Sequence, residues 1–557
     1  MLKSMDGKWI LVLVTMCLLV PFSGKAFHID DSLFVWSAEH IQHAPLDFFG
    51  FEINWNGTPN PAHHIIQNPP LTGYFLALSA IFFGLKEFGL HLAMILPAVT
   101  LVIGVFRLAQ MYSARLELSV LATLAAPAFL VSATTVMADM LLLALYVWSV
   151  VLWMEGLQHR NIRKMVLAGV VAGLAALTKY FALSLVPLLF VHTLTSRTKQ
   201  PRLWFCLLIP IAMLAVYQAV TVHLYGRDLV REALFFTSEW QIDKNWAPVR
   251  QTTVGLAFVG GSLLSAVFFA PFIFSRRSLL WVAGGGAICL LGLFVILNTG
   301  VIRIPNWERL SVAVQLQFVL FWAIGVYILL VAALELAHHR DGPTLTLFLW
   351  VVGTFVFSVY MNWTINARAL LPMLPPIAVI IARRTERCSI HSSGIRPGLI
   401  LALGLGLCVA AAVTWGDYQL ARSQKAFSMD LKKRLSGWFQ GHWGFQYYME
   451  AIGAHPMDFS GTVLKPGDIV VIPGNNTLTT SLPKQDYQLL ETIQKPVRAP
   501  VVTMNHAVGA SFYSSVWGVL PFAFHPVPAE TYRIYLAGHQ ANADAAARKL
   551  NLLPSAQ

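Results

Sequence analysis

Charged residues are scarce in this chain of 557 residues. The 39 Lys and Arg and the 27 Asp and Glu make up 12% of the sequence, whereas an average soluble domain carries about 25%. Hydrophobic residues reach 56%, and the mean hydropathy is +0.62. Disorder is excluded, because disordered chains combine low hydrophobicity with high net charge. A purely soluble enzyme is excluded as well, and the composition predicts an all-α polytopic membrane protein.

Cysteine is rare too. The chain has five, and all of them lie in or beside apolar runs: Cys17, Cys206, Cys289, Cys388 and Cys408. None falls in the long polar regions of the sequence. This distribution argues against both a disulfide framework and a cysteine metal site.

About thirteen apolar runs are long enough to be candidate membrane spans, which need about 20 residues each. They are roughly 9–24, 87–110, 116–136, 138–157, 165–178, 180–195, 203–224, 251–274, 279–300, 312–336, 343–361, 369–382 and 397–415. The stretch 165–195 is open to two interpretations, either two short helices that meet near Lys179 or one long kinked helix. The run 69–85 is also apolar, but it is short and begins at Pro69-Pro70. We expect it to form a helix along the membrane surface.

The basic residues alternate along the chain with the predicted loops. If the N-terminus is cytoplasmic, 17 of the 39 Lys and Arg lie in inner loops, 10 in outer loops and 12 in the tail from residue 417. Every inner loop is basic, as the positive-inside rule expects, and counting 69–85 as a span would break the alternation. The net charge of +12 therefore indicates orientation in a lipid bilayer, with an extracytoplasmic C-terminus, and no nucleic-acid partner.

The first apolar run has an alternative interpretation. Lys3 and Lys8 precede a short apolar core, as in a cleaved signal peptide, but no A-x-A-like cleavage site follows. We expect this helix to be retained. The first extracytoplasmic loop, with its juxtamembrane helices, then occupies 26–86.

The transmembrane domain is predicted to cover 1–416, and 417–557 to form a separate extracytoplasmic domain. Turn sequences such as Lys465-Pro466-Gly467-Asp468 interrupt this tail, and short β-like runs occur at 469–472 and 532–536. These signals predict a small C-terminal α/β domain.

Acidic residues and histidines gather in the first outer loop. Residues 26–85 contain no Lys or Arg at all. They do contain five carboxylates and five histidines, namely Asp30, Asp31, Glu39, Asp47, Glu52, His28, His40, His43, His63 and His64. An unpaired acid near lipid is costly, so this cluster indicates a base, a metal site or both. The alternative is that Asp30 or Asp31 only caps a following helix over 32–43.

Several other ionisable residues stand alone at the same predicted face. Asp139 starts an apolar helix, and Lys179 lies in an apolar stretch. Arg303, Arg309 and Arg368 lie near outer helix ends. One acidic cluster with scattered cations fits a site that binds a phosphate and abstracts a proton. The alternatives are that Asp139 only complements the helix dipole and that each cation is a snorkelling anchor.

Five short motifs follow one another between residues 26 and 385. They are Ile29-Asp30-Asp31-Ser32 followed by Ala38, Asn68-Pro69-Pro70-Leu71 with Tyr74, Val136-Met137-Ala138-Asp139, Gly173-Leu174-Ala175-Ala176-Leu177-Thr178-Lys179-Tyr180, and Arg368-Ala369-Leu370-Leu371-Pro372 followed by Pro375-Pro376. In order and spacing they resemble the C-type glycosyltransferases of family 39, which include protein O-mannosyltransferases and lipid A aminoarabinose transferases. The chain departs from the family at Ala369, where an aromatic residue is usual, and in its Asp-Asp rather than Asp-Glu pair. Neither change removes a functional group.

The resemblance implies a C-type glycosyltransferase fold in the plasma (inner) membrane and an inverting transfer on its outer side. The donor would be a sugar linked to polyprenyl phosphate, and the acceptor a hydroxyl of a lipid, a glycan or a protein. Asp30 would be the base, while Asp31 and Asp139 would orient the acceptor or hold a divalent cation. The lipid phosphate would be neutralised by Lys179, Arg368, Arg303 and Arg309.

Two other functions compete with this one. A transporter or flippase for a lipid-linked sugar would need ionisable residues near the membrane midplane. The sequence places Glu155 and Glu335 near inner helix ends and Asp139 near an outer one. The third possibility is a non-catalytic glycan-assembly protein in which the tail carries the function.

Overall fold

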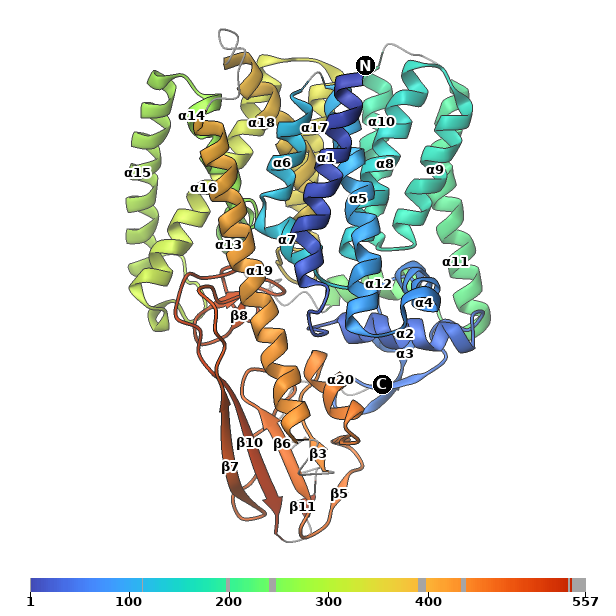
Figure 1. Cartoon of the computed structure of the whole chain (residues 1–557), viewed down its shortest axis with the longest axis vertical. Helices are drawn as coiled ribbons and strands as arrows, with labels where there is room; N and C mark the ends of the chain where they lie inside the picture. Colours follow the sequence, from blue (N-terminus) through green and yellow to red (C-terminus); the bar gives the residue numbers. More distant parts are fainter. Residues whose placement is uncertain are drawn as a thin grey trace.

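A bundle of long helices carries a small β-sheet domain at one of its ends in the computed structural model (Figure 1). The structure describes residues 2–112, 114–196, 201–239, 247–388, 397–431, 437–538 and 541–542. The bundle helices are α1 (Leu2–Leu19), α5 (Glu87–Met111), α6 (Leu116–Leu124), α7 (Pro127–Ser132), α8 (Asp139–Gln158), α9 (Ile162–Ala176), α10 (Leu185–Thr195), α11 (Ile209–Tyr225), α13 (Pro248–Ser262), α14 (Ala270–Ile273), α15 (Arg276–Asn298), α16 (Val312–His338), α17 (Gly342–Val356), α18 (Leu374–Cys388) and α19 (Pro397–Leu431).

Shorter helical segments join these helices or lie beside them. The 3₁₀ helices are η1 (Val20–Phe22), η2 (Tyr180–Ser184), η3 (Pro201–Leu208), η5 (Leu264–Phe269), η6 (Trp307–Arg309) and η8 (Leu371–Met373), and η7 (Phe357–Met361) is a π-helix. The remaining α-helices are α2 (Asp31–His43), α3 (Ala62–Ile65), α4 (Leu71–Phe83), α12 (Leu229–Glu239) and α20 (Trp443–Ala451).

The chain is an integral, multi-pass membrane protein. Within the described residues, seven helices are long and apolar enough to cross a bilayer. They are α5, α8, Trp204–Tyr225, α15, α16, α17 with η7, and α19. An eighth apolar unit is bent by 71° between α13 and η5–α14. The other predicted spans form shorter helices, so the total of about thirteen stays a prediction.

The helices break where the sequence supplies a reason. Pro127 separates α6 from α7, because proline is tolerated in the first turn of a helix but not in its interior. The stretch 165–195 forms two helices and not one. Lys179 lies between them with an extended backbone, φ −153° and ψ 136°. The break therefore places the Lys179 side chain at a helix end.

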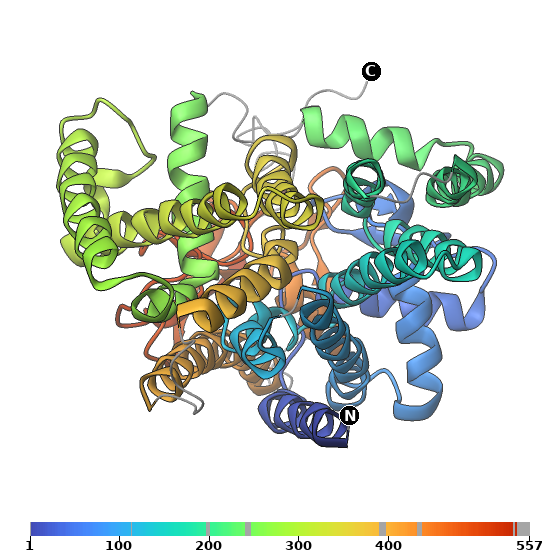
Figure 2. The same cartoon turned by 90° about the horizontal axis from the view of Figure 1, so that it is seen from above.

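Two helices of the first loop lie across the bundle axis. Figure 1 shows α2 at the end of the bundle that faces the sheet domain, and Figure 2 shows α4 running crosswise beside it. The two helices pack closely, since a Cβ on Gly73 would come within 2.9 Å of Ile41. Leu71 begins α4, and its amide donates to the carbonyl of Leu177, 3.2 Å away. This contact ties the Pro69-Pro70-Leu71 motif to the segment that carries Lys179.

The C-terminal domain is built on a five-stranded sheet in the order β4-β3-β6-β10-β7. The strands β6, β10 and β7 are antiparallel neighbours, and β3 runs parallel to β4 and β6. The strands of the whole chain are β1 (Glu52–Asn54), β2 (Pro59–Pro61), β3 (Trp438–Phe439), β4 (His455–Pro456), β5 (Val463–Leu464), β6 (Ile469–Pro473), β7 (Tyr487–Lys495), β8 (Met504–Asn505), β9 (Ala510–Ser511), β10 (Glu530–Ala537) and β11 (Ala541–Asn542).

Helix α19 connects the bundle to the sheet domain. It has 35 residues and is therefore about 50 Å long, more than the roughly 30 Å of a hydrocarbon core. Its last turns extend into the sheet domain (Figure 1). The domain boundary predicted at 416 falls inside this continuous helix, near Gly416. The backbone of α19 approaches the C-terminal segment there, since a Cβ on Gly416 would lie 2.4 Å from the carbonyl of Val501.

Part of the C-terminal region packs on the bundle rather than on the sheet. Phe512, Leu520 and Phe522 are fully buried in the same apolar core as the transmembrane helices. The sheet domain has two small cores of its own, one around Leu464 and one around Phe439. The C-terminal region therefore contributes residues both to the core of the helix bundle and to the cores of the sheet domain.

The buried carboxyl of Glu530 makes the stability of this protein depend on pH. Burial raises its pKa from the ordinary 4.5 to about 7. The folded state thus holds the proton more tightly than the unfolded chain, and the contribution to stability is present below about pH 4.5 and is lost as the pH rises through about 7. Glu530→Gln keeps an acceptor for Asn475, whose amide donates to Glu530 at 2.8 Å. We expect the variant to gain thermal stability over wild type between about pH 5 and about pH 8, measured by scanning fluorimetry. A difference in thermal stability between the two proteins that stays constant over this pH range would contradict this.

Candidate active site

The loop before α2 is held in a strained turn. Ile29 has φ +50°, in the left-handed region that a β-branched residue rarely enters. Asp31 holds this turn with both of its oxygens, which accept the amides of His28 at 2.8 Å and of Val136 at 3.0 Å. Burial raises the pKa of Asp31 to about 7. Asp31 therefore lies under the loop and joins it to the segment that leads into α8.

The structure contradicts the interpretation of the acidic pair as helix caps. Asp30 is in the N-cap position of α2, yet its side chain makes no capping hydrogen bond. Its Oδ2 instead lies 3.1 Å from Nη2 of Arg368. Asp31 bonds amides that lie outside the first turn of α2. The strained turn thus presents Asp30 to a distant part of the chain.

Four of the residues singled out in the sequence come together in one charged cluster. Arg368 lies between two carboxylates, with Nη2 next to Asp30 and Nη1 3.6 Å from Oδ2 of Asp139. The other oxygen of Asp139, Oδ1, accepts from Nζ of Lys179 at 2.7 Å. These side chains come from the start of α2, the start of α8, the break between α9 and η2, and the segment before η8. Acids and bases alternate, so the cluster is electrically balanced.

Exposure divides this cluster into an open part and a buried part. The side chains of Asp30 and Lys179 are 32% and 25% exposed, whereas those of Asp139 and Arg368 are 2% and 11% exposed. A molecule that enters from solvent or from the bilayer would therefore meet one carboxylate and one ammonium group. The buried pair beneath them sets their positions.

The two other predicted phosphate ligands lie elsewhere. Arg303 and Arg309 are exposed on the connection between α15 and α16. Among the described residues, no ion pair or hydrogen bond joins either of them to Asp30, to Asp139 or to any other side chain. The structure does not bring them into the cluster.

A divalent cation does not fit the predicted ligands. Both oxygens of Asp31 are occupied by backbone amides, and Asp139 faces Lys179 and Arg368. Within the part of the chain that the structure describes, no group of three His, Cys, Asp or Glu could hold a metal ion.

Sequence reasoning missed a second layer of residues behind the cluster. Lys25 and Asp417 are completely buried and form an ion pair of 2.6 Å. Tyr513 donates its hydroxyl to Oδ2 of Asp417 at 2.8 Å, and the Arg368 guanidinium lies over its ring, 5.3 Å from the centroid. The sequence signal for this second layer is Asp417, an acid in Trp415-Gly416-Asp417. It lies at the end of an apolar run, where an acid is typical of the start of a polar tail.

The two acids that the sequence places near inner helix ends, Glu155 and Glu335, are engaged in structural ion pairs. Glu335 is fully buried and faces three arginines, Arg383, Arg384 and Arg387. Glu155 pairs with Arg107 and Lys164. Both acids lie in the last part of their helices, α16 and α8. Neither contacts the cluster around Arg368.

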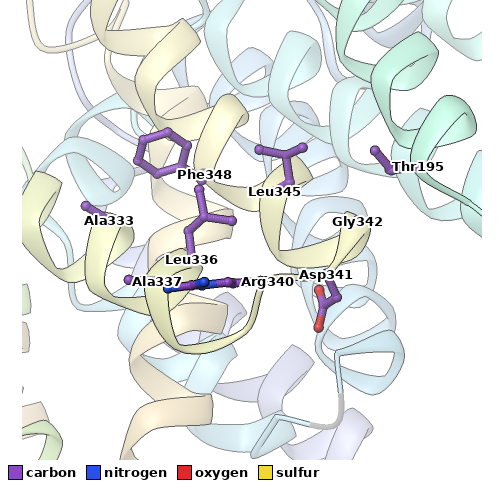
Figure 3. A pocket seen from close by; sticks show the side chains of 9 residues that line it. All are labelled: Thr195, Ala333, Leu336, Ala337, Arg340, Asp341, Gly342, Leu345 and Phe348. Carbon is purple, nitrogen blue, oxygen red and sulfur yellow. The ribbon is translucent and has the colours of Figure 1, made fainter.

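The described part of the chain also contains a cavity of about 460 Å³ at the opposite end of the bundle. It is lined by aliphatic residues of α16 and α17 with Phe348, and Figure 3 shows Arg340 and Asp341 along one side of it. Helix α16 begins beside the C-terminal region, where Gln317 bonds the backbone of Phe524, and ends at the cavity. The cavity is therefore separate from the charged cluster.

Comparisons with known proteins support the resemblance over part of the chain. The family model described as dolichyl-phosphate-mannose-protein mannosyltransferase matches residues 67–223. This match confirms the predicted resemblance for that stretch, which contains Asp139 and Lys179 but not Asp30 or Arg368. No curated protein matches the chain.

Two solved structures are similar to this chain at low identity and low TM-score. The oligosaccharyltransferase of Archaeoglobus fulgidus is 12% identical with a TM-score of 0.47, and the match covers 82% of this chain and 64% of that one. ArnT from Cupriavidus metallidurans, bound to undecaprenyl phosphate, is 15% identical with a TM-score of 0.42, and the match covers 85% and 95% of the two chains. This chain thus spans less than two thirds of the archaeal protein. At these scores neither likeness assigns a role to any residue.

Proposed function

We propose that this protein is a membrane glycosyltransferase. It moves a sugar from a polyprenyl-phosphate donor to an acceptor hydroxyl on the extracytoplasmic face, with inversion at the anomeric carbon. The observation that carries the proposal is the cluster of Asp30, Arg368, Asp139 and Lys179, in which a carboxylate and an ammonium group are both accessible. The description of the matching family model, which names dolichyl-phosphate mannose, supports a donor of this class.

Asp30 is the base in this proposal. It accepts the proton of the acceptor hydroxyl while that oxygen attacks the anomeric carbon of the sugar. The bond between this carbon and the phosphate oxygen breaks, and its electron pair stays on the phosphate. Arg368 holds Asp30 by one oxygen, which leaves the other free to take the proton.

Lys179 and Arg368 neutralise the departing phosphate. Hydrogen bonds between charged groups are about twice as strong as neutral ones, and they gain further strength in a site with little water. Asp139 contacts both cations and keeps them from spreading apart. Asp31 fixes the turn that presents Asp30. The orientation with a cytoplasmic N-terminus, in the plasma (inner) membrane, belongs to this proposal.

Lys179→Met tests the assignment of the donor site. Loss of one charge-assisted hydrogen bond costs about 1.5–3 kcal/mol, so kcat/KM for the donor should fall about 10- to 100-fold. The measurement is transfer of radiolabel from a polyprenyl-phosphate sugar by purified protein in liposomes, with the donor concentration varied. Lys86→Met is the matched control, because Lys86 is exposed at the start of α5, at the same face. Equal kcat/KM in the two variants would remove Lys179 from the site.

A further inference from the structure

We propose that the C-terminal region completes the active site, with Tyr513 as a positioning residue that holds Arg368 beside Asp30. This inference rests on the proposed function for its catalytic consequence and on contacts alone for its structural part. The part of the C-terminal region that would act here is the segment packed on the helix bundle, and not the sheet.

Arg368 depends on few contacts for its position. Its Nε is buried and has no hydrogen-bond partner among the described residues. The two Nη atoms reach Asp30 and Asp139, and Nη1 also donates to the sulfur of Met137. The ring of Tyr513 lies under the guanidinium. An arginine stacked on an aromatic face gains about 0.5–2 kcal/mol, more when water is excluded. Loss of the ring would remove the contact on that face of the guanidinium.

Tyr513 is itself held in place by a buried ion pair. Its hydroxyl donates to Asp417, and Asp417 accepts from Lys25 on the same oxygen. All three side chains are buried, and they come from three distant parts of the chain: the end of the first helical segment, α19 and the C-terminal region. The chain of contacts runs from Lys25 through Asp417 and Tyr513 to Arg368 and Asp30.

The segments that carry Tyr513 and Arg368 are also joined through their backbones. The amide of Ala367 donates to the carbonyl of Phe512 at 3.0 Å, and the amide of Ser515 donates to the carbonyl of Ile365 at 2.8 Å. The hydroxyls of Thr364 and Ser515 lie 2.9 Å apart. A displacement of residues 512–515 would therefore move the backbone next to Arg368. The backbone hydrogen bonds hold the segment that carries Arg368, and the stacked ring contacts the guanidinium of the same residue.

Tyr513→Leu tests this inference in the full-length protein. If Tyr513 acts through Arg368, the variant should lose about 10²-fold in kcat, as expected when a reacting group is displaced by about 1 Å. In an Arg368→Lys background the same substitution should cause little further loss, because its effect passes through the missing guanidinium. Equal losses in both backgrounds, or no loss in wild type, would overturn the inference. If Tyr513→Leu does not fold, Tyr513→Met, which also removes the ring under Arg368 but keeps more of the buried side-chain volume, takes its place in the cycle.

A second measurement does not depend on activity. Labelling of Arg368 by phenylglyoxal, followed by mass spectrometry of its peptide, reports whether the guanidinium is held. We expect labelling to become several-fold faster in Tyr513→Leu and to stay unchanged in Tyr112→Leu. Tyr112 is a matched control, because it is buried and its hydroxyl donates to the carbonyl of Pro343 away from the site. Unchanged labelling in Tyr513→Leu would overturn the positioning role. Faster labelling in a protein without transfer activity would refute the proposed function alone.

Discussion

Asp30→Asn is expected to reduce the rate of sugar transfer by about 10²–10⁴-fold, the usual contribution of a general base. The substitution keeps the size of the side chain and removes the group that would accept the proton. An amide oxygen can still accept from Nη2 of Arg368, so the cluster should stay assembled. The loss should therefore appear in kcat, with little change in KM for the donor. The rate of radiolabel transfer under saturating donor measures it.

The control for this prediction is Glu39→Gln. Glu39 belongs to the same acidic loop, is exposed on α2 and takes no part in the cluster. Its variant should transfer sugar at the wild-type rate. A wild-type rate in Asp30→Asn, with normal expression and thermal stability, would remove Asp30 from the role of base. Asp139 would then be the remaining acid in the cluster to test.

Lys25→Met is expected to have the largest effect on stability. Lys25 and Asp417 have no exposed side-chain surface, and removal of Lys25 leaves the buried carboxylate of Asp417 without its ion-pair partner, with the hydroxyl of Tyr513 still donating to it. Such a loss costs about 3–5 kcal/mol. Unfolding of the detergent-solubilised protein by heat and by denaturant measures the change, with Lys425→Met as the control. Lys425 pairs with Glu87 at 2.5 Å, but its side chain is 36% exposed, so its loss should cost much less.

The double variant Lys25→Met/Asp417→Leu distinguishes charge from packing. With both charges replaced by apolar groups of similar size, most of the lost stability should return. Tyr513 would still lack its acceptor, so transfer activity should stay below wild type. A double variant that is less stable than Lys25→Met alone would contradict this account of the buried pair.

Local sequence supplies the candidates for the charged cluster, because ionisable residues are conspicuous in an apolar chain. The sequence marks Asp30 as part of an acidic loop, and Asp139, Lys179 and Arg368 as isolated charges at the same predicted face, and the structure places the four together. Arg303 and Arg309 satisfied the same criterion and lie outside the cluster. The sequence indicates the depth of a charge in the membrane, but not its direction around the bundle. That direction depends on how helices far apart in sequence pack.

The second layer could not be predicted for a related reason. Lys25 follows an apolar run, where a snorkelling lysine is usual, and Asp417 ends another run. Their pairing joins residues 392 positions apart. Tyr513 lies in a region without a strong periodic pattern, so neither its return to the bundle nor its backbone pairing with the Arg368 segment is visible locally. The same limit explains why the predicted domain boundary falls inside α19.

A cryo-electron microscopy map of the protein with polyprenyl phosphate tests the central claim most directly. The account predicts phosphate density within ion-pair distance of Lys179 and Arg368, next to Asp30 and at the end of the bundle that carries the C-terminal domain. Phosphate density at the cavity beside Arg340, with none at the cluster, would contradict it.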